Sequence, residues 1–281
     1  MKKVAVLGLG IMGRGIADNF LKHGYDVIVW NRSADRAAEL VDKGARVAVS
    51  VADAVKDADM VFEVTANDES SRSVWLGAKG VMENSKPDAV LITCATLSVA
   101  WVDELAAACE KAGRTFFDMP MTGGRQGAES GQLILLAGGD ESKLASISTE
   151  LEVITAEVKY FGPAGSGMRF KLVLNALQAV HIAGFGEAMR LAHAMGLDEK
   201  KTGDALAERP GGVSTNIAWR DYQTEPNPIN FSVEWIAKDL GYALANVDDD
   251  SNQVMRDTLK AYTEAIKRGE SDEDWTAINR S

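Results

Sequence analysis

The chain is poor in the residues that build disulfide frameworks and metal centres. It has two cysteines in 281 residues, Cys94 and Cys109, and three histidines. The cysteines lie far apart, in neither a metal-ligand nor a redox spacing, and His23, His181 and His193 show no metal-ligand spacing either. We therefore expect no metal site, and we expect reduced thiols of the kind found in a cytoplasmic protein.

The chain also lacks an excess of basic residues and an apolar run of membrane length. Lys and Arg number 30 against 41 Asp and Glu, and the formal net charge is −11. This balance argues against a nucleic-acid partner, because such proteins carry a basic stripe. No apolar stretch approaches the ~20 residues of a membrane span, and the start lacks a signal-peptide pattern. We expect a cytoplasmic protein that binds neither nucleic acid nor membrane. A small anionic substrate stays open, because a site can be locally positive.

Glycine, by contrast, is placed where a dinucleotide needs it. Residues 4–7 form a short apolar run suited to a buried parallel strand, and a G-x-G-x-x-G pattern follows at once. A helical stretch over residues 12–23 comes next and ends at Gly24. An ordinary glycine-rich turn is the alternative, but a strand before and a helix after favour a pyrophosphate-binding turn. The predicted cofactor-binding residues of this turn are Gly8, Leu9, Gly10, Ile11, Met12 and Gly13.

The end of the second predicted strand bears on the choice of cofactor. An acid about 20 residues after the glycines would hold a ribose 2′-hydroxyl and select NAD. This chain has Asn31-Arg32-Ser33 there instead. Arg32 offers a planar, permanently charged fork for a 2′-phosphate, and Ser33 offers a hydroxyl. NADP(H) is therefore the predicted cofactor, with NAD(H) as the alternative if Arg32 only faces solvent.

Strand-like and helix-like stretches alternate through the first half of the chain, which predicts an α/β fold with a doubly wound parallel sheet. The apolar runs lie at residues 4–7, 27–30, 60–64, 90–93, 115–117 and 133–137. The pattern changes at Gly162-Pro163, after which a long apolar helix over about residues 166–195 opens an all-helical half. We place a dinucleotide-binding domain at residues 1–162. An all-α substrate and dimerisation domain, including the interdomain helix, follows at residues 163–281.

Lys171 lies early in that long apolar helix. A cation there is costly to bury unless it is paired with an opposite charge or takes part in chemistry. Asn175 follows at i+4, so both side chains share one helix face. A lysine whose ammonium simply reaches water is the alternative to a catalytic lysine.

A second glycine-containing segment, Thr122-Gly123-Gly124, follows the strand predicted at residues 115–117. Consecutive glycines after a hydroxyl residue can expose backbone N–H groups that suit a carboxylate. A flexible loop is the alternative. Residues 231–240 read as an amphipathic helix that carries Lys238 and Asp239.

Four segments together resemble the β-hydroxyacid dehydrogenase family, in order and over nearly the whole chain. They are residues 8–13, 118–133, 165–175 and 231–240. The resemblance implies a Rossmann-like domain followed by an all-helical domain, in a homodimer or homotetramer. It also implies that Lys171 is the catalytic acid/base and that Asn175 positions the substrate or the lysine.

The same resemblance assigns the remaining site residues. It implies that Thr122, Gly123 and Gly124 bind the substrate carboxylate and that Asp239 supports the active site. It further implies cofactor contacts from Thr96 and Lys238. The leading hypothesis is an NADP(H)-dependent dehydrogenase of a small β-hydroxy acid, acting as a semialdehyde reductase. An imine reductase and a non-catalytic NADP(H)-binding scaffold are the alternatives.

Several positions depart from the family pattern and are expected to affect the substrate pocket. Alanines replace a frequent serine and a frequent proline, and the other positions carry unusual or bulky side chains. They are Thr65, Ala66, Ala95, Met119, Met121 and Trp235. The Asn31-Arg32-Ser33 triplet resembles the NADPH-preferring branch that reduces glyoxylate and succinic semialdehyde.

Overall fold

The computed structural model describes residues 2–208, 213–246 and 252–280. The chain divides into two compact units, Met1–Lys171 and Leu172–Ser281. The division falls inside the long helix α10 (Ser166–Ala194), whereas the sequence pattern changes at residue 162. The first turns of this helix therefore belong with the sheet-bearing unit.

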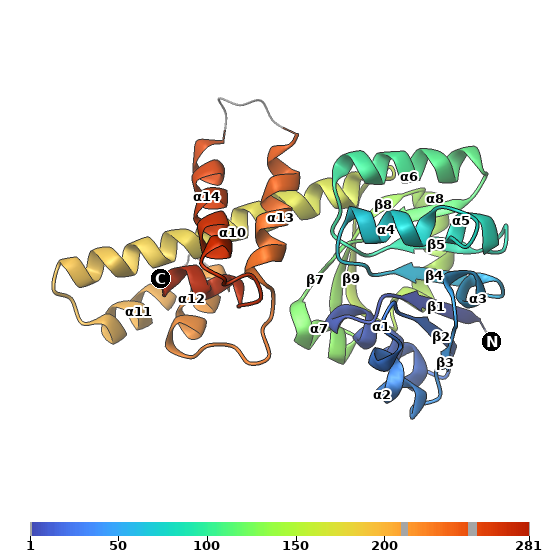
Figure 1. Cartoon of the computed structure of the whole chain (residues 1–281), viewed down its shortest axis with the longest axis horizontal. Helices are drawn as coiled ribbons and strands as arrows, with labels where there is room; N and C mark the ends of the chain where they lie inside the picture. The colour runs from blue at the N-terminus through green and yellow to red at the C-terminus, as the bar shows by residue number, and fades with distance from the viewer. Residues whose placement is uncertain (1, 209–212, 247–251, 281) are drawn as a thin grey trace. The chain divides into compact units, whose positions relative to one another are not determined.

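The first unit is built on one sheet, which contains nine strands within the described residues (Figure 1). The strand order is β3-β2-β1-β4-β5-β6-β8-β7, and β9 pairs with β8. Strands β1 to β6 are parallel, which confirms the predicted doubly wound sheet. The strands are β1 (Lys3–Leu7), β2 (Asp26–Trp30), β3 (Arg46–Val47), β4 (Met60–Glu63), β5 (Val90–Thr93), β6 (Thr115–Asp118), β7 (Met121–Thr122), β8 (Leu133–Gly139) and β9 (Thr155–Gly162).

Several features of the sheet differ from the sequence expectation, including the two-residue strands β3 and β7, which lie outside the predicted apolar runs. Strand β8 runs antiparallel to β6 and β7, because a short connection turns the chain back beside them. Strand β9 was not expected at all, since most of its side chains are exposed and it has no apolar run. It pairs with β8 in parallel, so the sheet continues past the predicted strands.

Both faces of the sheet are covered, because its central strands are apolar on both sides. On β1, Val4 and Val6 belong to one core and Ala5 and Leu7 to the other. In Figure 1, α1 (Ile11–Lys22), α2 (Ala38–Val41) and α7 (Gly124–Ser130) lie on one side of the sheet. The other side carries α3 (Val51–Val55), α4 (Asp68–Trp75), α5 (Val81–Asn84) and α6 (Val99–Lys111). Short helices complete the unit: η1 (Ala34–Ala37), α8 (Glu141–Leu144), η2 (Ala145–Ile147) and α9 (Ser148–Leu151).

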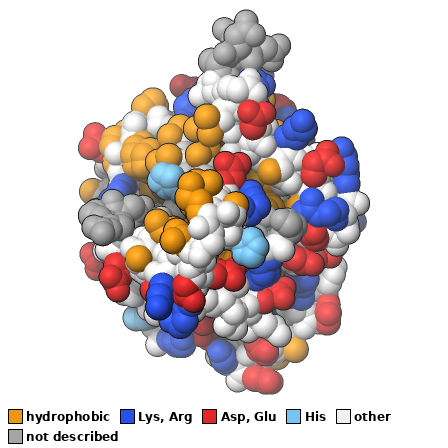
Figure 2. Space-filling view, turned by 90° about the vertical axis from the view of Figure 1, so that its left-hand side faces the viewer, with side chains coloured by type: hydrophobic (Ala, Val, Ile, Leu, Met, Phe, Trp, Pro, Cys, Tyr) orange, Lys and Arg blue, Asp and Glu red, His pale blue; other side chains and the backbone are white. Residues whose placement is uncertain are grey.

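The named elements of the second unit within its described residues are all helices, as predicted, and an isolated β-bridge joins Ser232 to Asp274. Its helices after α10 are α11 (Glu199–Ala207), α12 (Val213–Gln223), α13 (Val233–Leu244), α14 (Gln253–Lys267) and η3 (Trp275–Asn279). Its core includes Ile182, Phe185, Trp219, Leu240 and Tyr262. Figure 2 shows hydrophobic side chains gathered over part of the face in view.

Helix α10 is long and apolar enough to cross a membrane by length and composition. However, 44% of its most apolar window is buried inside the protein, and core helices of globular proteins pass the same test. The apolar character of α10 is therefore accounted for in part by packing within the chain.

Candidate active site

The glycine turn after β1 has the geometry that a dinucleotide requires. Gly8 has a φ of +102°, and a Cβ there would lie 2.4 Å from the carbonyl oxygen of Val64. A Cβ on Gly13 would lie 1.9 Å from the carbonyl oxygen of Gly8. Around Gly10 there is nothing within 4 Å of such a Cβ. Two glycines are thus required by the turn and by close packing, while the middle one leaves space for a phosphate.

This turn lies at the point where the sheet reverses its strand order. From β1 the chain proceeds to β2 and β3 on one side and then to β4, β5 and β6 on the other. Ligands of such sheets bind outside the carboxyl ends of the strands at this switch point. Helix α1 begins at Ile11 directly after Gly10, so its first N–H groups face the same edge.

Asn31 holds the glycine turn to the end of β2. Its Oδ1 accepts a hydrogen bond from the Leu9 N–H at 2.9 Å, and its Nδ2 donates to the Ser33 carbonyl at 2.9 Å. Arg32 and Ser33 are exposed beside it. Asn31 therefore orders the turn through its side chain, and Arg32 and Ser33 remain at the surface.

A row of polar side chains lies where the parallel strands end, at what we call the carboxyl edge of the sheet. It was not identified from the sequence. Strand pairing places the polar residues Glu63, Thr93 and Asp118 side by side on β4, β5 and β6, next to Leu7 on β1. Both acids are fully buried. No sequence pattern distinguishes them from acids that end a strand in solvent, because only the register brings them into one row.

Glu63 ties together the loop after β4 and its neighbours. Its Oε1 accepts from the Thr65 N–H at 2.9 Å and from the Thr65 hydroxyl. Its Oε2 accepts from Thr93 Oγ1 at 2.5 Å and from Trp75 Nε1 at 3.3 Å. The carboxylate has a donor for each oxygen, which is how a charge is tolerated without water.

The residues just after β5 are packed rather than open. Cys94 and Ala95 are buried, and Thr96 is half-buried in the loop that leads to α6. Burial raises the pKa of the Cys94 thiol, so it stays protonated and unreactive. Met119 and Met121 lie in the core of the first unit. That Ala95, Met119 and Met121 line the substrate pocket stays a prediction.

The second glycine pair forms an exposed turn between β7 and α7. Gly123 has a φ of +118° and Gly124 a φ of +61°, a region that residues with a Cβ rarely adopt. Both glycines are exposed, Thr122 is half-buried beside them, and nothing lies within 4 Å of a Cβ built on Gly124. This turn presents backbone at the surface of the first unit.

Asp118 joins the end of β6 to the start of α10. Its Oδ1 accepts from the Gly165 N–H and its Oδ2 from the Met168 N–H, both at 2.6 Å. Burial raises the pKa of Asp118 to about 7, although these two N–H groups oppose the shift. Lys171 lies three residues beyond Met168 on α10 and is 9% exposed. The backbone of Lys171 therefore lies close to the residues that are hydrogen-bonded to Asp118 at the end of β6.

The other predicted polar residues lie in the second unit. Asn175 Nδ2 donates to Asp239 Oδ2 at 2.7 Å, and both residues are buried. Lys238 Nζ lies 3.1 Å from Asp239 Oδ1 and sits over the Tyr242 ring at 5.5 Å from its centroid. Asn175, Lys238 and Asp239 thus form one cluster. Asn175 is also one turn along α10 from Lys171.

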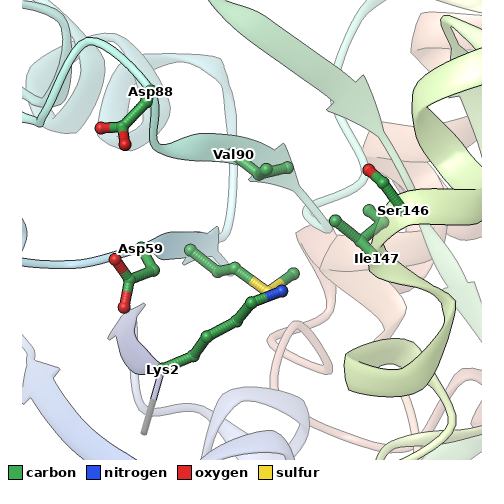
Figure 3. Close-up of a pocket in the computed structure, with 7 residues that line it drawn as sticks. Lys2, Asp59, Asp88, Val90, Ser146 and Ile147 are labelled. Carbon is green, nitrogen blue, oxygen red and sulfur yellow. The ribbon is translucent and has the colours of Figure 1, made fainter.

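The opposite end of the parallel strands, where they begin, is the amino edge of the sheet. It has a depression of about 350 Å³ (Figure 3). Lys2, Asp59 and Asp88 are among its lining residues. Lys2 pairs with Glu150 at 2.8 Å, and Asp59 accepts from the Lys3 N–H and pairs with Lys86. These pairs lie at the amino ends of the strands, away from the glycine turn. Within the described residues, no group of three or more His, Cys, Asp or Glu is arranged to hold a metal ion.

Each of the two units corresponds approximately to a known protein family. A family described as the NAD binding domain of 6-phosphogluconate dehydrogenase matches residues 3–162. A family described as the NAD-binding domain of NADP-dependent 3-hydroxyisobutyrate dehydrogenase matches residues 165–281. Together the two matches span nearly the whole chain.

Individual relatives and a solved structure cover similar lengths. An uncharacterized oxidoreductase of Synechocystis is 32% identical over 244 residues, which covers 85% of this chain and 84% of the relative. The mitochondrial 3-hydroxyisobutyrate dehydrogenase of Homo sapiens is 30% identical over 290 residues, which covers 98% and 85%. The Mycobacterium tuberculosis 3-hydroxyisobutyrate dehydrogenase, solved with L-serine, superposes with a TM-score of 0.88 at 26% identity over 100% of this chain and 98% of that chain. The chain therefore belongs to the β-hydroxyacid dehydrogenase family and is an NAD(P)-dependent oxidoreductase of the 3-hydroxyisobutyrate dehydrogenase type.

Proposed function

We propose that the protein interconverts a small β-hydroxy acid and its semialdehyde with NADP(H), and that Lys171 is the general acid/base. The observation that carries this proposal is the position of Lys171. It is a nearly buried lysine on a helix that is hydrogen-bonded to the end of β6, at the edge of the sheet where the glycine turn lies. A desolvated amine at a ligand-binding edge is suited to proton transfer.

The residues at the edge fit a dinucleotide. The first N–H groups of α1 and the space beside Gly10 would hold the pyrophosphate. When bound, the cofactor supplies or accepts the hydride at its nicotinamide ring. The protein must then orient the substrate and donate a proton to its reacting oxygen, or accept a proton from it.

Proton transfer is the part assigned to this chain. In the reducing direction, the carbonyl carbon gains a hydride and its oxygen becomes an alkoxide, which takes a proton from the Lys171 ammonium. In oxidation the neutral Lys171 amine accepts the hydroxyl proton as the hydride leaves. Thr122, Gly123 and Gly124 would bind the substrate carboxylate, because the exposed glycine turn can approach an anion closely. Asn175 would orient the substrate or the lysine, with Asp239 holding its amide.

A preference for NADP(H) is supported by the end of β2. Arg32 and Ser33 are exposed there, and Asn31 stands where an NAD-selecting acid would lie. The description of the family that matches residues 165–281 is also that of an NADP-dependent enzyme. Thr96 after β5 and Lys238 on α13 would add cofactor contacts.

The proposal extends to location and assembly. Both cysteines are buried and free, as suits a cytoplasmic protein. Along α10 and just after it, large apolar side chains are exposed at Val173, Leu177, Leu191, Met195 and Leu197. A second copy of the chain would cover such residues in a homodimer or homotetramer. Light scattering after size exclusion would show a single monomer mass if this part is wrong.

A panel of glyoxylate, succinic semialdehyde and methylmalonate semialdehyde, each with NADPH and with NADH, tests the reaction. We expect NADPH-linked turnover with at least one of these acids. Cyclic imines belong in the same panel, since turnover of an imine in place of the acids would assign the protein to imine reduction. Tight NADPH binding without turnover of any compound would favour a scaffold.

The role of Lys171 has its own test. Lys171→Ala is expected to lower turnover by about 10²–10⁴-fold, because it removes the proton-transfer group. NADPH affinity, measured by calorimetry, should stay within about twofold of wild type if the lysine acts on the substrate oxygen alone. Turnover equal to that of wild type would refute the assignment.

A further inference from the structure

We infer that Asp118 is a positioning residue for the reaction: by holding the start of α10 against the end of β6, it sets the place of the Lys171 ammonium. This inference rests on the proposed proton transfer by Lys171. It concerns a buried acid that the proposed chemistry does not otherwise use.

The hydrogen bonds of Asp118 are directed at the backbone that carries Lys171. Both carboxylate oxygens are used, one on the Gly165 N–H and one on the Met168 N–H, at 2.6 Å each. These are short bonds for an N–H donor, as expected when the acceptor can carry charge. Lys171 is three residues beyond Met168, which is less than one turn of helix. A shift of this turn would therefore be transmitted directly to the lysine backbone.

The surroundings leave Asp118 little room to move. A Cβ on Gly138 of β8 would lie 2.4 Å from Asp118 Oδ1 and 2.8 Å from the Gly167 nitrogen. A Cβ on Gly167 would lie 2.0 Å from the Leu136 carbonyl oxygen. Helix α10 thus meets β8 backbone to backbone at two glycines, and the carboxylate fits between them. A side chain packed this closely cannot shift without moving its partners, because protein interiors have few voids.

Other contacts hold the same turn from its outer side. Arg169 pairs with Asp103 through two hydrogen bonds of 2.9 and 2.8 Å. The rings of Phe161 and Phe170 stack with centroids 4.0 Å apart. These contacts involve exposed or half-exposed side chains, so they add less than the buried carboxylate. Asp118 is the inner anchor of the turn, and the Arg169–Asp103 pair is the outer one.

The direct test is Asp118→Asn, which keeps the shape but removes the charge and one acceptor oxygen. We expect kcat to fall on the order of 10–10²-fold, since small misplacements of a catalytic group cost about this much. The Kd for NADPH should change by less than about twofold. The matched control is Glu150→Gln, which removes a buried carboxylate at the opposite edge of the same sheet. It should leave kcat at the wild-type value.

A double mutant separates this inference from the proposed function. If Asp118 acts through Lys171, adding Asp118→Asn to Lys171→Ala should cause no further loss of kcat. Wild-type kcat in Lys171→Ala would defeat the proposed function. A large loss in Lys171→Ala together with wild-type kcat in Asp118→Asn would overturn the positioning role alone.

A milder variant keeps the inference testable if Asp118→Asn does not fold. Arg169→Gln loosens the same turn from its solvent side, where the loss of an exposed ion pair is tolerated. We expect a two- to fivefold fall in kcat, an order-of-magnitude figure for partial misplacement, with NADPH affinity unchanged. An unchanged kcat in this variant would contradict the dependence of Lys171 on the first turn.

Discussion

The two edges of the sheet in the first unit satisfy their acidic side chains differently. At the amino edge, Glu150 pairs with Lys2, and Asp59 pairs with Lys86. At the carboxyl edge, the donors to Glu63 and Asp118 are hydroxyl, indole and backbone N–H groups. Ion pairs at the amino edge neutralise charge locally, although Asp59 also accepts from the backbone N–H of Lys3. The acids at the carboxyl edge order backbone, namely the loop after β4 and the first turn of α10.

This difference shows where buried acids hold backbone segments in place. An acid that accepts from neutral groups fixes loops in place without bringing a cation of its own. The loop after β4 lies against the glycine turn, where the cofactor is expected, since a Cβ on Gly8 would lie 2.4 Å from the Val64 carbonyl oxygen. We therefore expect changes at the carboxyl edge to alter catalysis or cofactor binding, and changes at the amino edge to alter stability slightly.

The largest effect should come from the glycine turn, where Gly13→Ala and Gly10→Ala form a pair. A Cβ on Gly13 would lie 1.9 Å from the Gly8 carbonyl oxygen, which is backbone and cannot move aside. Gly13→Ala should therefore cost more than about 3 kcal/mol of stability and abolish cofactor binding. Gly10→Ala meets no protein atom within 4 Å, so it should weaken NADPH binding with stability nearly unchanged.

Thermal unfolding with and without NADPH separates the two variants. The cofactor should raise the Tm of wild type and should raise that of Gly10→Ala less. Equal stability of Gly13→Ala and wild type would mean that helix α1 does not pack against β1 as closely as the geometry indicates.

The next effect concerns the pH dependence of stability at Asp118. Folding raises its pKa from 3.8 to about 7, so between these values the folded chain holds a proton that the unfolded chain has released. The stabilisation is complete below the unfolded pKa and is lost as the pH rises through the folded pKa. The difference is at most ~4 kcal/mol, from about three units at ~1.4 kcal/mol each. Asp118→Asn should remove this part of the slope.

Urea unfolding at about pH 5 and about pH 8 measures this contribution. Wild type should lose more stability over this range than Asp118→Asn does. The same slope in both proteins would place the titration elsewhere. Glu150→Gln serves again as the control, because it leaves the carboxyl edge unchanged.

The parts of the fold that could be predicted are those with a local signal. Strands β1, β2, β4 and β5 are apolar runs, and the glycine pattern marks the turn after β1. Strand β9 could not be predicted, because its exposed charged residues resemble a loop until β8 lies beside it. Tertiary pairing decides such a strand.

The candidate site shows the same division. Lys171 stands out as a cation in an apolar helix, whereas Asp118 and Glu63 look like ordinary polar residues at the ends of strands. Their burial follows from register, which no single segment contains. Asn31 illustrates the reverse, since its position predicts a cofactor contact and its side chain is used to hold the glycine turn.

A smaller effect is expected at the end of β2, which tests the choice of cofactor. Arg32→Ala should weaken NADPH binding about tenfold, or ~1.4 kcal/mol, because a charged fork is lost from an exposed site. Binding of NADH should stay nearly the same, since NADH has no 2′-phosphate for Arg32 to contact. Calorimetric titration with each cofactor measures both values. Equal losses for both cofactors would show that Arg32 supports the loop rather than the phosphate.

The smallest effect belongs to the amino edge, at the pair of Lys86 and Asp59. Burial opposes ionisation of Asp59, but hydrogen bonds from Lys86 and from the Lys3 N–H outweigh it and lower its pKa. Both side chains are about one-third exposed, so Lys86→Met should cost less than about 1 kcal/mol at neutral pH. High salt should shrink that loss further, because the pair is screened. Kinetic constants should match those of wild type, since the pair holds no loop near the glycine turn. A fall in kcat in this variant would contradict the contrast between the edges, because it would show that an ion pair at the amino edge also affects the reaction at the carboxyl edge.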